Sequence, residues 1–175
     1  MISSIFVRTA PGDPRRGILV AGGRPVPCAL GRSGMHMPKR EGDGATPVAA
    51  MRIVAGWFRP DRMTRPQSAL DLEPIEPREG WCDAPADPNY NRPVRLPFAA
   101  SHETMLREDR LYDVCLVLDW NLPPFGRKRY GGSAIFLHIA KPGFPPTEGC
   151  IAVAPAAMRW LLPRIGPRTV VRTLF

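Results

Sequence analysis

Prolines and glycines interrupt this 175-residue chain so often that they leave little room for a long helix. The apolar stretches between them are short, for example IFV at 5–7, ILVA at 18–21 and VCLVL at 114–118. Short apolar runs bounded by turn-forming residues are typical of strands joined by loops. The 44% hydrophobic content is enough to build a packed core, so we expect a folded, mostly β protein.

The pattern predicts strands and two short helices in a definite order. The strands are expected at 3–9, 17–30, 48–60, 111–120, 133–140, 150–154 and 168–175, with GGRP turning the second into a hairpin. One helix is expected at 101–109, where Ser101 is a potential N-cap, and another at 155–165, where Pro155 suits the first turn. The architecture expected from the residues is a sandwich or a barrel.

Two segments are predicted to lack regular structure. Residues 31–47 form a polar, Gly-rich loop, and residues 61–100 form an extended, Pro-rich insertion. Trp81 and Tyr90 in the insertion are expected to pack onto the rest of the molecule. Residues 1–175 are the length of one typical domain, so we expect a single domain that includes this insertion.

The formal charge of +8 indicates an anionic partner or surface. Nucleic acid is disfavoured, because the basic residues are scattered and no nucleic-acid-binding motif accompanies them. No apolar stretch is long enough to cross a membrane, and the N-terminal segment lacks the pattern of a signal peptide. A membrane surface and a cell-wall polymer remain among the anionic partners, and no feature specifies an oligomeric state.

The four cysteines, Cys28, Cys82, Cys115 and Cys150, show no C-x-x-C pair and no zinc-ligand spacing. We therefore expect no structural zinc site. Two disulfides are arithmetically possible. Cys115, however, lies inside an apolar run, where a lone thiol usually acts as a small hydrophobic side chain.

The segment FLHIAKPGFPPTEGCIAVA at 136–154 places an imidazole and a thiol at the two ends of one loop. A neighbouring histidine can take the proton of a thiol and later return it, so His138 and Cys150 are a candidate base and nucleophile. Gly149 allows a sharp turn, and backbone N–H groups at such a turn can stabilise an oxyanion. Thr147 offers a hydroxyl on the same rim. The alternative is that both residues are structural, since buried His and Cys are common in cores.

These residues resemble the catalytic motif of the L,D-transpeptidases of the YkuD type. The motif is an apolar strand ending in His, a Gly/Pro loop, then Ser/Thr-x-Gly-Cys and an aliphatic residue. GDGATP at 42–47 resembles the family's D-G-x-T-P turn, and WCDAPADPNYN at 81–91 resembles its Trp-Asp-Pro…Tyr-Asn segment. The resemblance extends from about residue 17 to residue 171. His36 lies in a polar loop and His102 lies beside a potential helix cap, and neither has an evident partner.

The resemblance implies a mixed β-sandwich with a covering loop over the active-site cysteine. It implies that Cys150, with His138 as base, attacks the stem peptides of peptidoglycan and releases a terminal D-Ala. Backbone N–H groups of Gly149 and Cys150 would hold the oxyanion, and an amine would then accept the acyl group. No cofactor is required, and the expected location is the cell envelope or periplasm.

Four departures from the family pattern keep alternatives open. Glu148 stands where the family usually has His, and Ala152 where it usually has Arg. The loop from His138 to Cys150 is shorter than usual, and VAAM follows the D-G-x-T-P turn. The alternatives are an inactive wall-binding relative, a Cys–His hydrolase of the same peptides, and a basic nucleic-acid-binding domain.

The aromatic and polar residues of the 80–91 segment suggest one further hypothesis. Trp81, Asp83, Tyr90 and Asn91 suit a wall of a groove for a sugar-peptide ligand. The alternative is that Trp81 only anchors the Pro-rich segment to the rest of the molecule.

Overall fold

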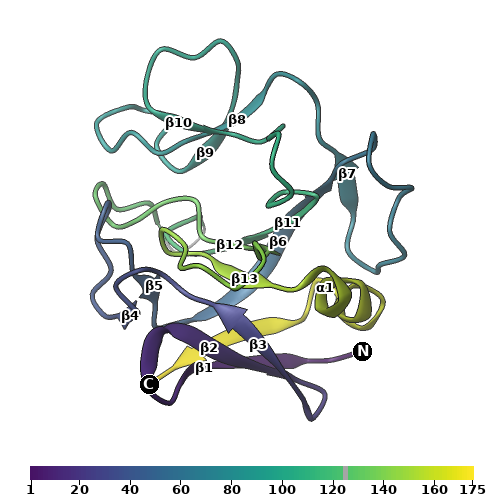
Figure 1. The fold of residues 1–175 in the computed structure, drawn as a ribbon. Helices are drawn as coiled ribbons and strands as arrows, with labels where there is room; N and C mark the ends of the chain where they lie inside the picture. The colour runs from purple at the N-terminus through teal and green to yellow at the C-terminus, as the bar shows by residue number, and fades with distance from the viewer. Residues whose placement is uncertain (124–125) are drawn as a thin grey trace.

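The computed structural model describes residues 1–123 and 126–175. Its strands are β1 (Ser4–Ala10), β2 (Asp13–Ala21), β3 (Arg24–Ala29), β4 (Met35–His36), β5 (Thr46–Pro47), β6 (Ala50–Phe58), β7 (Leu72–Pro74), β8 (Glu79–Cys82), β9 (Arg92–Arg95), β10 (His102–Thr104), β11 (Val114–Leu118), β12 (Phe136–Ile139), β13 (Ile151–Val153) and β14 (Val170–Leu174). The helical elements are α1 (Pro155–Leu161) and the 3-10 turn η1 (Leu162–Arg164). Figure 1 shows their arrangement.

The main sheet has nine strands in the order β11-β12-β13-β3-β2-β1-β14-β6-β7 and closes through a further pairing of β6 with β11. Strand β6 closes the ring between β14 and β11, because its nine residues are enough to pair with each of these strands in turn. Its first residues pair with β14, and residues 53–58 pair with β11. The mostly β prediction is thus confirmed, whereas the predicted sandwich is replaced by a barrel-like closed sheet with β7 attached outside the ring.

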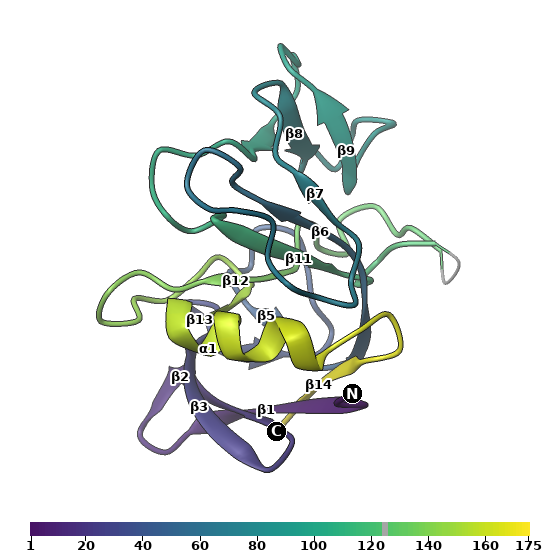
Figure 2. The same ribbon diagram turned by 90° about the vertical axis from the view of Figure 1, so that its right-hand side faces the viewer.

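A smaller, three-stranded sheet of order β10-β8-β9 lies beyond β11 and β12, at the end of the molecule opposite β1, β2 and β3 (Figures 1 and 2). It gives the Pro-rich insertion regular structure that the sequence did not predict. Every residue of β11 and of β12 is buried, because one face lines the barrel and the other faces this small sheet. The two faces belong to two separate clusters of buried apolar residues.

The barrel interior is filled mainly by aliphatic side chains, and α1 packs Ala157, Met158 and Leu161 into it. The second cluster lies between the barrel and the small sheet. It contains Trp57, Trp81 and Phe136, whose rings meet edge to face, and it also includes Cys150.

Seven strand predictions are confirmed, including the hairpin of β2 and β3, whose turn residues Gly22 and Gly23 both have positive φ. The helix at 155–165 is confirmed as α1 followed by η1, with Pro155 in the first turn. The loop at 31–47 contains the short parallel pair β4 and β5.

The helix predicted at 101–109 is wrong. Residues His102–Thr104 form β10, which pairs antiparallel with β8, and the rest of the segment is irregular. Local helix signals lost to tertiary pairing, because the free edge of β8 offers backbone partners that a short isolated helix cannot match.

Candidate active site

His138 and Cys150 are positioned by two neighbouring parallel strands. His138 lies in β12 opposite Ala152 of β13, and Cys150 precedes β13 by one residue. Because side chains alternate along a strand, Cys150 and Ala152 face the same side as His138. Both side chains line a cavity of about 240 Å³, where His138 is 3% and Cys150 9% exposed. The structure therefore brings the predicted base and nucleophile to one cavity.

The Cys150 thiol is held by two backbone groups. Its Sγ donates to the carbonyl of Ala134 at 3.1 Å and accepts the N–H of Phe136 at 3.4 Å. His138 Nδ1 lies 2.9 Å from the carbonyl of Ile139. A carbonyl accepts only from a protonated nitrogen, so this contact assigns the proton to Nδ1 and leaves Nε2 as the proton acceptor.

Burial keeps both groups uncharged. It lowers the pKa of His138 to about 4 and raises the pKa of the Cys150 thiol to about 12. Near neutral pH the resting pair is therefore a neutral imidazole and a thiol. Proton transfer from such a pair has to accompany nucleophilic attack, since no thiolate is stored beforehand.

A segment from β10 to the start of β11 covers the other side of the cavity. Tyr112 lies edge to face with His138, with 5.4 Å between ring centroids, and its hydroxyl donates to Glu103 at 3.0 Å. Arg107 lies over the Tyr112 ring and is paired with Asp109. Burial raises the pKa of Glu103 and that of Tyr112.

This covering group was not predicted, because Glu103 and Arg107 fell in the wrongly predicted helix. Residues 107–110 are the only four consecutive charged residues in the sequence, and they were the available signal.

Thr147 and Gly149 shape the loop that carries the thiol. The Thr147 hydroxyl donates to the carbonyl of Cys150 at 2.7 Å and accepts the N–H of Gly149 at 3.2 Å. Gly149 has a φ of +138°, and a Cβ there would lie 2.8 Å from the carbonyl oxygen of Ala45. Because the N–H of Gly149 already donates to the Thr147 hydroxyl, an oxyanion would compete with Thr147 for this N–H.

The GDGATP turn lies against this loop. Asp43 accepts the backbone N–H groups of Arg40 and Ala45 and pairs with the buried Lys39. These bonds hold the pKa of Asp43 below its usual range despite its partial burial. The fully buried Thr46 accepts the N–H of Gly31 at 2.9 Å. The turn thus places Ala45 where only a glycine fits at position 149.

The structure does not bring Trp81 and Asn91 to the cavity. They are 4% and 1% exposed, and the Trp81 indole donates to the Asn91 side chain at 3.0 Å. Tyr90 is also buried, and its hydroxyl donates to Glu41. Asp83 is half-buried and lies outside the cavity lining. Trp81, Asp83, Tyr90 and Asn91 of the 81–91 segment therefore lie outside the cavity lining.

A family model of the YkuD L,D-transpeptidase catalytic domain matches residues 6–172. The chain belongs to the YkuD family. Among solved structures it is similar to L,D-transpeptidase 1 of Mycobacterium tuberculosis, with 11% identity and a TM-score of 0.42. That similarity covers 98% of this chain and 62% of the other, so the chain spans about three fifths of that protein's length. No protein with a curated function matches the sequence.

Two of the departures from the YkuD motif, Glu148 and Ala152, have distinct surroundings. Glu148 is exposed and paired with Arg32 at 2.8 Å, so its carboxylate is directed to the rim. Ala152 is buried directly opposite His138. The basic residues that line the cavity instead come from elsewhere, namely Arg107 and Lys141.

Other predicted features can also be placed. All four cysteines are free and buried. Across residues 1–123 and 126–175, no three His, Cys, Asp or Glu side chains form a possible metal site, and no helix has the length and apolarity to span a membrane. His36 is exposed, and the ring of His102 contacts the carbonyl of Ala100.

Proposed function

We propose that this YkuD-family protein is a cysteine acyltransferase that acts on the stem peptides of peptidoglycan. The observation that carries the proposal is that Cys150 and His138, the two residues that match the family motif, line one cavity from neighbouring strands. The proposed location is the cell envelope, where this substrate occurs, and the positive net charge suits an anionic polymer.

The proposed reaction begins when Nε2 of His138 takes the thiol proton as Sγ attacks the carbonyl carbon before the terminal D-Ala. A C–S bond forms, and the carbonyl oxygen becomes an oxyanion that faces the backbone N–H groups of Gly149 and Cys150. The C–N bond then breaks, and His138 returns the proton to the D-Ala amine. An amine of a second stem peptide attacks the thioester, His138 takes its proton, and the thiol is restored.

The Cys150 thiol donates to the carbonyl of Ala134 at rest, so it has to leave this bond before His138 can take its proton. Tyr112 and Arg107 line this cavity, with Arg107 over the Tyr112 ring. Arg107, which is paired with Asp109, is our candidate for binding a peptide carboxylate in place of the Arg that the family usually has at position 152.

The test is intact-mass spectrometry after incubation with a disaccharide-tetrapeptide donor. We expect a mass gain equal to the donor minus D-Ala in the wild type and none in Cys150→Ala, with accumulation strongly slowed in His138→Ala. Cys115→Ala is the matched control, since Cys115 is a buried thiol opposite His138 on β11 and should leave the adduct unchanged. Adding an amine acceptor separates a transferase from a hydrolase of the same peptides.

The burial of Cys150 favours a second candidate, a wall-binding relative without this chemistry. A thiol whose pKa is raised to about 12 is a poor nucleophile at rest. This candidate predicts that the folded protein sediments with peptidoglycan but forms no adduct and releases no D-Ala. Those results together would overturn the acyltransferase proposal.

A further inference from the structure

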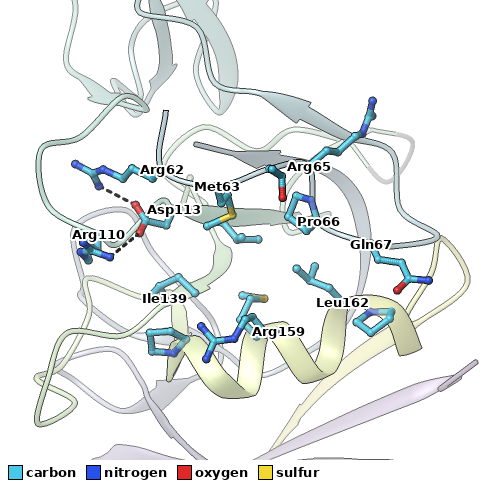
Figure 3. A pocket seen from close by; sticks show the side chains of 15 residues that line it. Arg62, Met63, Arg65, Pro66, Gln67, Arg110, Asp113, Ile139, Arg159 and Leu162 are labelled. Atoms are coloured by element: carbon cyan, nitrogen blue, oxygen red, sulfur yellow. Dashed lines mark hydrogen bonds and ion pairs between the residues drawn. The ribbon is translucent and has the colours of Figure 1, made fainter. Parts of the chain in front are cut away.

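A second, larger cavity lies away from Cys150, between the segment 62–67, the start of β11 and helix α1 (Figure 3). Its volume is about 530 Å³, within the range of small-molecule sites. We call it the arginine cavity, after its four arginines. They are Arg62, Arg65, Arg110 and Arg159.

One carboxylate in this cavity is paired with two of the four guanidinium groups. Asp113 bonds to Arg62 at 2.7 Å, and Arg110 lies 3.9 Å from its other oxygen. Arg159 of α1 has no hydrogen-bond or ion-pair partner in the described part of the chain. Arg65 is paired with Asp71 and points away from the cavity in Figure 3. Positive charge therefore remains uncompensated at one side of the cavity.

Apolar side chains also line the arginine cavity. Met63, Ile139, Met158 and Leu162 line it, and Figure 3 shows Met63 and Leu162 facing the space beside Arg159. The side chains of Ile139, Met158 and Leu162 also belong to the barrel core. A rigid apolar floor beside the unpaired guanidinium group of Arg159 suits a ligand that is hydrocarbon at one end and anionic at the other.

The arginine cavity is linked to the thiol by a hollow between them. This hollow shares Arg110 and Ile139 with the arginine cavity, and Leu111 and Lys141 with the cavity of Cys150. The three spaces follow one another along the segment that leads into β11. A ligand in the arginine cavity therefore lies on the same surface as the thiol without occupying its site.

We propose that the arginine cavity binds a small amphipathic anion. Its carboxylate or phosphate group lies between Arg110 and Arg159, where planar guanidinium groups can form paired hydrogen bonds. Its hydrocarbon part lies on Met63 and Leu162. Binding does not depend on the chemistry proposed for Cys150.

Isothermal titration calorimetry of the full chain tests this site with three probes of similar hydrocarbon size. The probes are 4-phenylbutyrate, phenethyl phosphate and the neutral 4-phenylbutan-1-ol. We expect one anion to bind per chain, and the alcohol to bind at least about tenfold more weakly because it lacks a charge-assisted hydrogen bond. The tighter of the two anions identifies the head group as carboxylate or phosphate.

Variants then locate the site. Arg110→Ala and Arg159→Ala should each weaken anion binding by about tenfold and leave the alcohol unchanged. Both side chains are exposed, so folding should be retained, which the melting midpoint checks. Arg168→Ala, an exposed arginine outside the cavity, is the charge control, and Cys150→Ala should bind as the wild type does.

Three results would overturn the proposal. They are no saturable binding up to about 10 mM, equal affinity for the anions and the alcohol, and anion affinity that Arg168→Ala lowers as much as Arg159→Ala does.

Discussion

The indole N–H of Trp81 donates to the side-chain oxygen of Asn91, with 3.0 Å between nitrogen and oxygen. The same oxygen accepts the backbone N–H of Ala134 at 3.1 Å, and the Ala134 carbonyl accepts the thiol of Cys150. Two residues that do not line the cavity are thus linked to the candidate nucleophile through one intervening residue. Ala134 itself has a φ of +52°, a conformation that an L-alanine holds only when its surroundings fix it.

Asn91→Ala should lower the free energy of unfolding by more than about 2 kcal/mol, because it leaves several buried groups without partners. Besides Trp81 and Ala134, these include the carbonyls of Trp120 and Asn121, which accept from the Asn91 amide. Urea unfolding measures the change. The exposed Asn89→Ala should stay within about 0.5 kcal/mol of the wild type. An unchanged midpoint with reduced activity would instead favour the groove-wall hypothesis.

Gly149→Ala should be more destabilising than Gly12→Ala. Both glycines have positive φ, so both substitutions strain the backbone, typically by about 1 kcal/mol. A Cβ at position 149 also meets the Ala45 carbonyl at 2.8 Å, whereas position 12 is open. We expect an additional loss of about 1–3 kcal/mol at position 149 from overpacking. Equal unfolding midpoints for the two variants would show that the GDGATP turn yields to the added methyl group.

Thr147→Val should disturb the thiol loop more than Thr147→Ser. Valine has nearly the same shape but can neither donate to the Cys150 carbonyl nor accept from Gly149. We expect Thr147→Val to lower the free energy of unfolding by about 1–3 kcal/mol and serine to restore most of it. The alkylation rate of Cys150 gives a second readout, since a loosened loop exposes the thiol. If valine and serine behave alike, the hydroxyl does not hold the loop.

Alkylation of Cys150 by iodoacetamide should rise about tenfold per pH unit between pH 7 and pH 10. Burial raises its pKa to about 12, so the thiolate fraction keeps growing throughout this range. A plateau near pH 9 is expected only for a cysteine of ordinary pKa, such as one in the urea-unfolded chain. Peptide mapping by mass spectrometry separates Cys150 from the other three thiols. Rapid, pH-independent alkylation at pH 7 would mean that the thiolate is already formed.

His138 should make the protein sensitive to mild acid. Burial lowers its pKa to about 4 from 6.5, so the unfolded chain binds a proton in this interval and the folded chain does not. Its contribution to stability is complete above pH 6.5 and is lost as the pH falls to about 4. The loss amounts to about 3 kcal/mol. Chemical unfolding at pH 6.5 and at about pH 4 should show this extra loss for the wild type and not for His138→Gln. An equal loss of stability with pH in the two proteins would contradict the lowered pKa of His138.

Much of the fold was predictable because the apolar runs are short and well separated. Residues 111–120 were expected to be a strand, and β11 within this range is buried on both faces. The hairpin of β2 and β3 followed from the two glycines at its turn. Closure of the sheet was not predictable, since the pairing of β6 with both β14 and β11 depends on twist over the whole sheet rather than on local sequence.

Part of the candidate site was predictable, because its two central residues are close together in the sequence. His138 and Cys150 lie close in sequence, and their strands are neighbours. Glu103 and Tyr112 reach the cavity from a covering segment that has no periodic pattern. Asn91 was singled out for its residue type, but whether a buried amide faces a ligand or backbone carbonyls depends on packing that the sequence alone does not encode.

The closed ring has a consequence for biosynthesis. Strand β14, at residues 170–174, supplies the pairing partner for both β1 and β6, which are translated far earlier. Until the ribosome has released β14, both earlier strands present an unpaired edge, the feature through which nascent chains associate with one another. The barrel can therefore be completed only after translation of its last strand. Chaperone dependence during synthesis is expected to end at that strand.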